Sequence, residues 1–165
     1  MKKVKTCVVI CFVLLFTLGC GSDQFREKKV YGEGYELLKC DMTVEEETEA
    51  QVMYLQIVRD IKASKIVDTS INLEFDYSDM LKDDSKGTAK KTVHSGLNLM
   101  CDAFEKEGYV DCYYTVDNNI YTVSMGVNIN DLGESVVTEN ASLEDIKTAI
   151  ETQNELKVKN CVLEK

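Results

Sequence analysis

The chain has 165 residues, and its 29 acidic residues outnumber its 19 basic ones, so the formal net charge is −10. A surface this acidic is repelled by phosphate groups, which argues against a role in nucleic-acid binding. The single histidine, His94, excludes a zinc site with two histidine ligands, and any histidine-based hydrolytic triad would have to use it.

The N-terminus has the order of features typical of a secretory signal peptide. Lys2, Lys3 and Lys5 precede an uncharged run of 13 residues, Thr6–Leu18. An uncleaved signal anchor is the alternative, but the run is shorter than the roughly 20 apolar residues that span a bilayer. We therefore expect residues 1–19 to be removed on export.

The signal ends in Leu18-Gly19-Cys20, which resembles the bacterial lipobox. The resemblance implies that the Cys20 thiol receives a diacylglycerol, that a peptidase cleaves before Cys20, and that fatty acids such as palmitate anchor the protein. Two or more acyl chains hold a protein firmly at a bilayer, at about 0.8 kcal/mol per buried CH₂. We expect the lipid bilayer to be the partner of acylated Cys20. The mature chain would then lie at the bacterial cell membrane, facing outside the cytoplasm.

A polar, charged stretch follows, and residues 20–34 are predicted to be a lipidated tether. Without the three leader lysines, 16 basic residues stand against 29 acidic ones, which gives the exported part a net charge of −13. Residues 35–165 contain no repeat and no second change of composition. Their length suits a single domain with its own core.

Apolar residues alternate in the first part of this domain, which predicts strands. The predicted strands are 35–44, 50–59 and 66–77, and Leu38 and Cys40 share one face of the first. Short polar connections separate them. We therefore expect a meander of three antiparallel strands.

Helical spacing replaces this alternation between residues 89 and 104, where apolar residues recur every three or four positions. Asp84 or Ser85 can cap the start of the helix. Gly108 can end it, because glycine readily adopts a left-handed conformation.

The segments 109–117 and 120–129 flank Asn118-Asn119, a pair that tolerates the positive φ angles of a two-residue hairpin turn. This turn places four apolar pairs on one face, in agreement with the hydrophobic pattern. The pairs are Val116 with Tyr121, Tyr114 with Val123, Cys112 with Met125, and Val110 with Val127.

A second helix is predicted after Ser142, because Ser142–Asp145 resembles a capping box with Asp145 in place of Glu or Gln. Residues 158–163 are predicted to return as a short edge strand or a terminal arm. Strands grouped with strands predict a two-layer α+β fold. Its antiparallel sheet would combine the three-strand meander and the hairpin, with two helices packed on one face.

Four cysteines remain once the leader and Cys20 are set aside, an even number in a compartment that permits disulfides. Three pairings are possible, and spacing alone does not choose among them. We hypothesise that Cys101 on the first helix pairs with Cys112 on the inward face of the hairpin, and that Cys40 pairs with Cys161. A four-cysteine zinc site is a rival, which the lack of any C-x-x-C pair argues against, and free thiols are a third possibility.

The layout of the chain resembles that of the YehR-like small bacterial lipoproteins. The shared features are the lipobox, the charged tether, a strand that carries Leu38-Lys39-Cys40, the order of strands and helices, and a late cysteine, Cys161. The resemblance covers the whole chain and implies a small α+β lipoprotein whose biochemical role is not established. It carries over no catalytic residue.

Few residues suggest chemistry. His94 neighbours Ser95 on the predicted helix, where side chains at i and i+1 point apart, so we expect a solvent-facing histidine. The run Asp79–Asp83 lacks the glycine and the bidentate acid of a calcium loop, so we expect solvated charges and no metal site. On the outer face of the hairpin, Tyr109, Asp111 and Tyr113 could contact a peptide or glycan, or form an ordinary half-solvated sheet surface.

These features together predict a non-enzymatic binding or interaction module at a membrane surface, with no cofactor and with a protein, peptide or glycan partner. Two alternatives stay open. One is a cell-envelope hydrolase that uses acidic residues, which should have a pocket with converging titratable groups. The other is an accessory subunit of a membrane complex.

Overall fold

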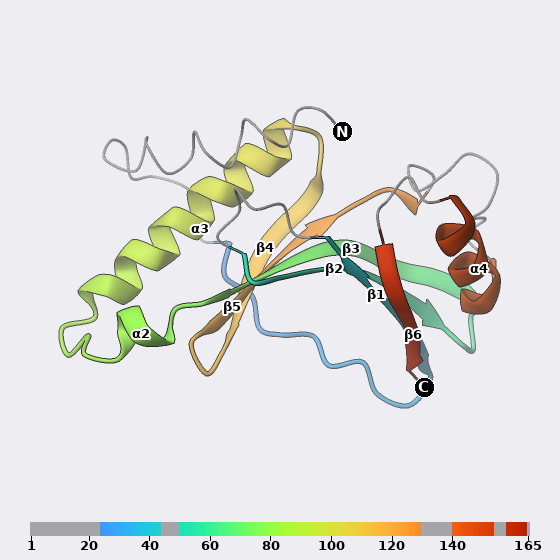
Figure 1. Cartoon of the computed structure of the whole chain (residues 1–165), viewed down its shortest axis with the longest axis horizontal. Coiled ribbons are helices and arrows are strands. Elements are labelled where there is room, and N and C mark those ends of the chain that lie inside the picture. Colours follow the sequence, from blue (N-terminus) through green and yellow to red (C-terminus); the bar gives the residue numbers. More distant parts are fainter. Residues whose placement is uncertain (1–23, 44–49, 130–139, 154–157, 165) are drawn as a thin grey trace. The chain divides into compact units, whose positions relative to one another are not determined.

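The computed structural model describes residues 24–43, 50–129, 140–153 and 158–164 (Figure 1). Its elements are β1 Tyr35–Met42, β2 Val52–Asp60, β3 Lys65–Asp76, α2 Ser78–Leu81, α3 Thr88–Lys106, β4 Val110–Asp117, β5 Ile120–Gly126, α4 Leu143–Gln153 and β6 Val158–Glu164. In this part of the chain, six strands form an open antiparallel sheet in the order β4-β5-β3-β2-β1-β6. The predicted α+β class, the meander and the hairpin are confirmed.

The chain divides into two compact units, which are described separately. The described residues of unit 1 are 24–28, 50–51 and 73–125. Those of unit 2 are 29–43, 52–72, 126–129, 140–153 and 158–164. The leader, the predicted lipid site Cys20, the acidic turn after β1 and most of the loop before α4 lie outside the described residues.

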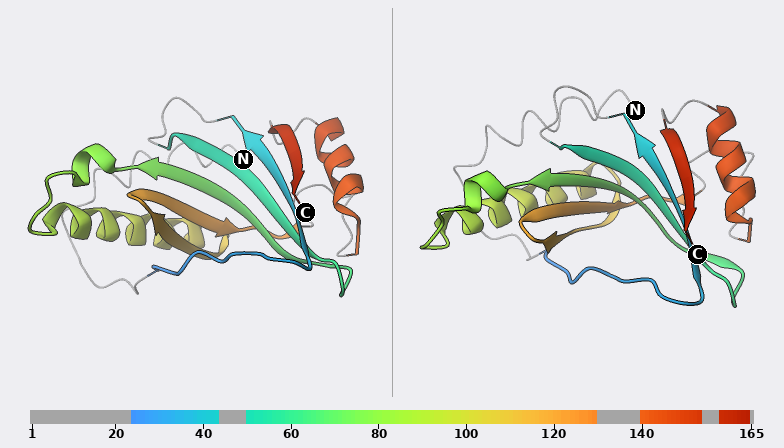
Figure 2. Two further views of the ribbon diagram at one scale, coloured as in Figure 1. Left: turned by 90° about the horizontal axis from the view of Figure 1, so that it is seen from below. Right: turned by 60° about the horizontal axis from the view of Figure 1, so that its bottom comes forward.

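Unit 2 is built on β1, which pairs with a strand on each side. Its register with β2 runs from Tyr35 opposite Asp60 to Met42 opposite Met53. On its other side β6 pairs antiparallel with it, so of the two predicted alternatives, an edge strand or a terminal arm, the structure shows the edge strand. Figure 2 shows α4 alongside β6, the same unit's last strand.

The core of unit 2 lies between this sheet and α4. Alternation puts the apolar residues of β1 and β2 on one face, and the apolar side of α4 covers them. The buried cluster includes Leu38, Cys40, Leu55, Ile57, Leu143, Ile146 and Ile150. At the start of α4, the Ser142 Oγ accepts the Asp145 N–H at 3.2 Å and donates to the Asp145 carboxylate at 2.6 Å. Ser142 thus caps the start of α4 as predicted, while the reciprocal bond from the Ser142 backbone N–H that completes a capping box stays a prediction.

Unit 1 is built on α3 and the hairpin of β4 and β5. The buried residues of α3 recur at helical spacing and face the hairpin; they are Val93, Leu97, Cys101 and Phe104. The hairpin contributes Cys112, Tyr114, Tyr121, Val123 and Met125, which are all buried. Asn118 and Asn119 have φ values of 50° and 67°, as the predicted two-residue turn requires.

Gly108 ends α3 as predicted. Its φ is 101°, and the N–H of Tyr109 returns to the carbonyl of Phe104 at 3.1 Å. This bond satisfies a carbonyl that the end of the helix would otherwise leave without a donor.

The prediction that Val110 faces the core is wrong. The side chain of Val110 is 63% exposed, and the next residue, Asp111, has a φ of 55°. A left-handed residue interrupts the strict alternation of a strand, so the residues before it no longer keep the inward register. The apolar pattern therefore holds from Cys112 onward and fails at the first residue of β4.

The helices differ in part from the expectation. A short helix, α2, was not predicted, while α3 and α4 match the two that were. In unit 1, α3 packs on β4, and in unit 2, α4 packs on β1 and β6. That both long helices lie on one face of the sheet is not confirmed and stays a prediction.

Both predicted cysteine pairs are bonded in the structure, one in each unit. Cys40 joins Cys161 with a Cα–Cα distance of 4.0 Å, and Cys101 joins Cys112 with a Cα–Cα distance of 5.1 Å. The first pair connects neighbouring strands, and the second attaches α3 to β4. Each of the two small hydrophobic cores is therefore stabilised by one disulfide.

Removing the two disulfides should cost unequal amounts of stability. The sequence separations are 121 and 11 residues, and a longer closed loop removes more entropy from the unfolded chain. We expect the Cys40→Ser/Cys161→Ser variant to lose about 5 kcal/mol of unfolding free energy, and the Cys101→Ser/Cys112→Ser variant about 3 kcal/mol, in the chain-entropy account. Urea unfolding of both variants measures this. A larger loss in the short-loop variant would contradict it.

Asp84 should make the stability of α3 depend on pH. Its carboxylate accepts the N–H groups of Thr88 and Lys90, both at 2.8 Å, and the bond from Lys90 is the main reason that its pKa lies below the ordinary 3.8. A lowered pKa stabilises the fold above the ordinary value, and this contribution is lost as the pH falls through the folded value. We expect Asp84→Ala to lower the melting temperature at pH 7, and the difference from wild type to vanish in acid below pH 3.8. Thermal unfolding across pH tests this, with Asp83→Ala as the control for an exposed acid.

Candidate functional site

A short segment of the predicted tether, Gln24–Lys28, is part of unit 1; we call it the stalk. Phe25 forms a parallel β-bridge with Tyr114. The N–H of Tyr114 donates to the carbonyl of Gln24 at 3.0 Å, and the N–H of Arg26 donates to the carbonyl of Tyr114 at 2.9 Å. β4 stands at one end of the strand order, so the stalk adds strand-like pairing to an open sheet edge.

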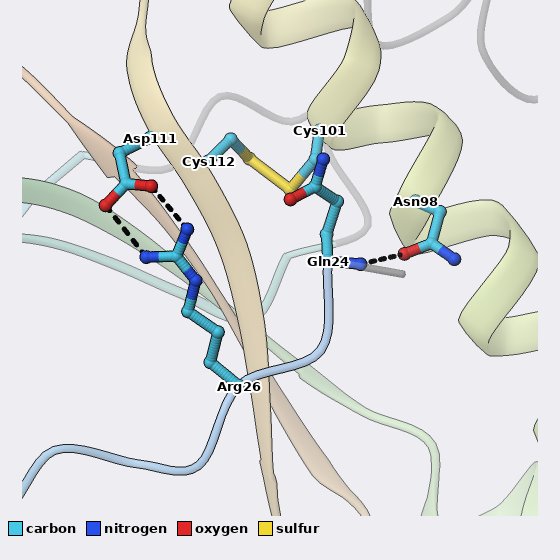
Figure 3. The surroundings of a disulfide bond; sticks show 6 residues. All are labelled: Gln24, Arg26, Asn98, Cys101, Asp111 and Cys112. Carbon is cyan, nitrogen blue, oxygen red and sulfur yellow. Dashed lines mark hydrogen bonds and ion pairs between the residues drawn. A yellow bond between two sulfur atoms is a disulfide. The ribbon is translucent and has the colours of Figure 1, made fainter. Parts of the chain in front are cut away.

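The charged side chains of the stalk meet the acids of β4. Arg26 forms a two-bond ion pair with Asp111, with one of its contacts, Nη1 to Oδ2, at 2.8 Å (Figure 3). The guanidinium also lies over the Tyr113 ring, 4.6 Å from its centroid. The hydrogen bond to Asp111 raises the pKa of Arg26. Further along, Lys28 Nζ lies 3.9 Å from the Asp117 carboxylate.

The start of the stalk is bound to α3. The backbone N–H of Gln24 donates to Oδ1 of Asn98 at 3.0 Å (Figure 3). The Cys101–Cys112 disulfide lies beside this contact and joins the two elements that the stalk touches. The disulfide therefore holds α3 and β4 in the arrangement that binds the stalk.

Phe25 completes an aromatic cluster. Its ring stacks on His94 with centroids 6.3 Å apart, and it lies 5.8 Å from the ring of Tyr114. His94 makes edge contacts with Tyr114 and Tyr121, and its Nε2 lies 3.3 Å from the Tyr121 hydroxyl. Burial raises the pKa of Tyr121. The expectation of a solvent-facing histidine is wrong, because His94 is half-buried among aromatic rings.

The structure brings two of the three predicted face residues together. Asp111 and Tyr113 both contact Arg26. Tyr109 packs edge-on against Phe104 at 5.6 Å, and burial, with a smaller effect of the Glu107 charge, raises its pKa. Tyr109 thus belongs with the end of α3.

Sequence reasoning missed the stalk residues because the surrounding composition is that of a linker. The signal in the sequence was Phe25, a large aromatic residue among the polar residues and glycine of 21–29. Gln24 and Arg26 pair with Tyr114 through backbone groups, which every residue except proline has, so no sequence pattern predicts this pairing. Only the folded chain shows that Gln24, Phe25 and Arg26 are bound.

Two acids of the described residues, Asp76 and Asp84, have a lowered pKa. The pKa of Asp76 is lowered by its bonds from Ser78, and that of Asp84 by the N–H groups at the start of α3. A glycosidase acid needs a raised pKa, so neither residue suits that role. Among the described residues, no group of three or more His, Cys, Asp or Glu side chains could hold a metal ion.

No helix within the described ranges has both the length and the apolar character to cross a membrane. Comparisons with protein-family models, with curated proteins and with solved structures found no match for this chain.

Weakening the Arg26–Asp111 pair should expose the stalk. Both side chains are about half exposed, so the pair contributes about 1 kcal/mol, and Asp111→Asn should open the stalk about fivefold more often. Trypsin cleavage after Arg26 measures this opening, because a protease needs an extended, unpaired chain. Asp83→Asn removes an exposed charge elsewhere in unit 1 and should leave the cleavage rate unchanged. Equal cleavage of wild type and Asp111→Asn would contradict the role given to the pair.

Proposed function

We propose that this protein is a bacterial lipoprotein, anchored to the membrane through acylated Cys20 and facing outside the cytoplasm, with a folded part that serves as a non-enzymatic interaction module. The observation that carries the anchor is the order of the leader: three lysines, a 13-residue uncharged run and Leu18-Gly19-Cys20. The YehR-like small lipoproteins remain the family that we propose for it.

The two disulfides support an exported location. Disulfides persist in oxidising compartments and are rare in the reducing cytosol. Cys40–Cys161 and Cys101–Cys112 use every cysteine of the described residues, so the folded part contributes no thiol there. This usage fits a protein that matures outside the cytoplasm.

The chemistry of the β4 edge supports an interaction module. Asp111 and Tyr113 hold a guanidinium by charge, hydrogen bonds and ring contact, and the backbone of Tyr114 pairs with an extended segment. These are the elements by which sheet edges bind peptides. The stalk occupies this edge, so a partner protein or peptide with an extended basic segment would bind here by displacing it.

Metabolic labelling with a fatty-acid analogue tests the anchor. Wild-type protein should incorporate the label, and Cys20→Ala should lose all of it, because the thiol is the acylated group. Cys7→Ala removes a leader cysteine that the proposal leaves unmodified, and it should keep full labelling. Label on Cys20→Ala, or none on wild type, would refute the proposal.

A further inference from the structure

The stalk is bound by backbone and side-chain contacts together, which a free tether does not make. Two N–H···O bonds join it to Tyr114, and a third joins Gln24 to Asn98. Arg26 and Lys28 meet the two acids of β4. The chain is therefore fixed on unit 1 from Gln24 to Lys28.

We propose that the β4 edge of unit 1 is a membrane-facing surface, held close to the lipid by the docked stalk. The inference rests on the proposed lipid anchor at Cys20. Only four Cα–Cα steps separate Cys20 from Gln24, so at full extension they lie at most about 14 Å apart. Without docking, the first residue fixed by a strand would be Tyr35, fifteen steps away, at up to about 50 Å.

The distribution of charge favours this orientation. The exported part carries a net charge of −13, and the cytoplasmic membrane's anionic lipids repel such a charge. Residues 20–34, however, hold three acidic and three basic residues and are neutral. Docking places Arg26 on Asp111 and Lys28 on Asp117, so both acids of β4 are neutralised. Each acid of β4 therefore has a cationic partner, which lowers its repulsion from an anionic surface.

The fluorescence of an introduced tryptophan can measure the distance between this edge and the membrane. The chain has no tryptophan of its own, so the signal comes from the introduced residue alone. Val110→Trp places a single reporter at the exposed first residue of β4. The acylated full-length protein is reconstituted into phosphatidylcholine and phosphatidylglycerol vesicles that contain a lipid with a nitroxide head group, which quenches tryptophan at short range. We expect strong quenching, which Arg26→Glu should lower about twofold because the freed tether lets unit 1 move away.

Two further variants make the result specific. Lys29→Glu makes the same change of charge three residues further along the chain and should leave the quenching unchanged. Adding Asp111→Arg to Arg26→Glu restores an ion pair of opposite polarity, and it should restore the quenching. Circular dichroism checks that each variant keeps its fold.

The outcomes separate the inference from the anchor proposal. Quenching that falls with Arg26→Glu and returns with the reversed pair supports the membrane-facing edge. Vesicle-bound protein whose quenching is weak, or is the same in all variants, overturns it while leaving the anchor in place. Wild-type protein that fails to sediment with the vesicles overturns both, and trypsin protection of the stalk then still reports whether docking occurs.

Discussion

β4 lies at the end of the sheet, and a strand in that position must find partners for backbone groups that no neighbouring strand pairs. Here the chain supplies the partner itself, since Tyr114 uses its N–H and its carbonyl to bind the stalk. Pairing of this kind fixes the side chains as well, because successive residues of an extended segment point to opposite sides. Phe25 consequently enters the aromatic cluster, while Arg26 reaches Asp111 and Tyr113.

The Cys101–Cys112 disulfide stabilises the β4 edge by fixing β4 to α3. It ties α3 to β4 across a loop of few residues, and the stalk contacts both elements, through Asn98 and through Tyr114. In unit 2 the Cys40–Cys161 bond plays the corresponding part by joining β1 to the last strand of the chain. Each unit thus combines one apolar cluster with one covalent bond, which suits units too small to bury a large core.

The outer face of the hairpin has residues suited to binding a partner, but in this structure it binds a segment of the same chain. Exposed aromatic residues on a strand are typical of recognition sites. In this chain Asp111 and Tyr113 recognise an arginine 85 and 87 positions earlier in the same sequence. The composition of this face predicted contact with either a peptide or a glycan. The structure shows that it binds an extended segment of the chain itself, through the guanidinium of Arg26.

The sequence by itself determined the features that depend on neighbours along the chain. Alternation defined the strands, Asn118-Asn119 defined the hairpin turn, Gly108 ended α3, and Ser142 with Asp145 began α4, because each is a local choice of backbone conformation. The cysteine pairs were a hypothesis among three possible pairings, and the structure confirmed them.

Tertiary structure alone decided the docking of the stalk, the exposure of Val110 and the surroundings of His94. Almost any residue of the tether could form backbone hydrogen bonds with Tyr114. The sequence of residues 20–34 therefore does not predict these bonds. The left-handed φ of Asp111, which turns Val110 outward, belongs to a residue that also accepts an ion pair from far away in the sequence. Long-range contacts of this kind depend on packing and charge in three dimensions, which the pattern of neighbouring residues does not encode.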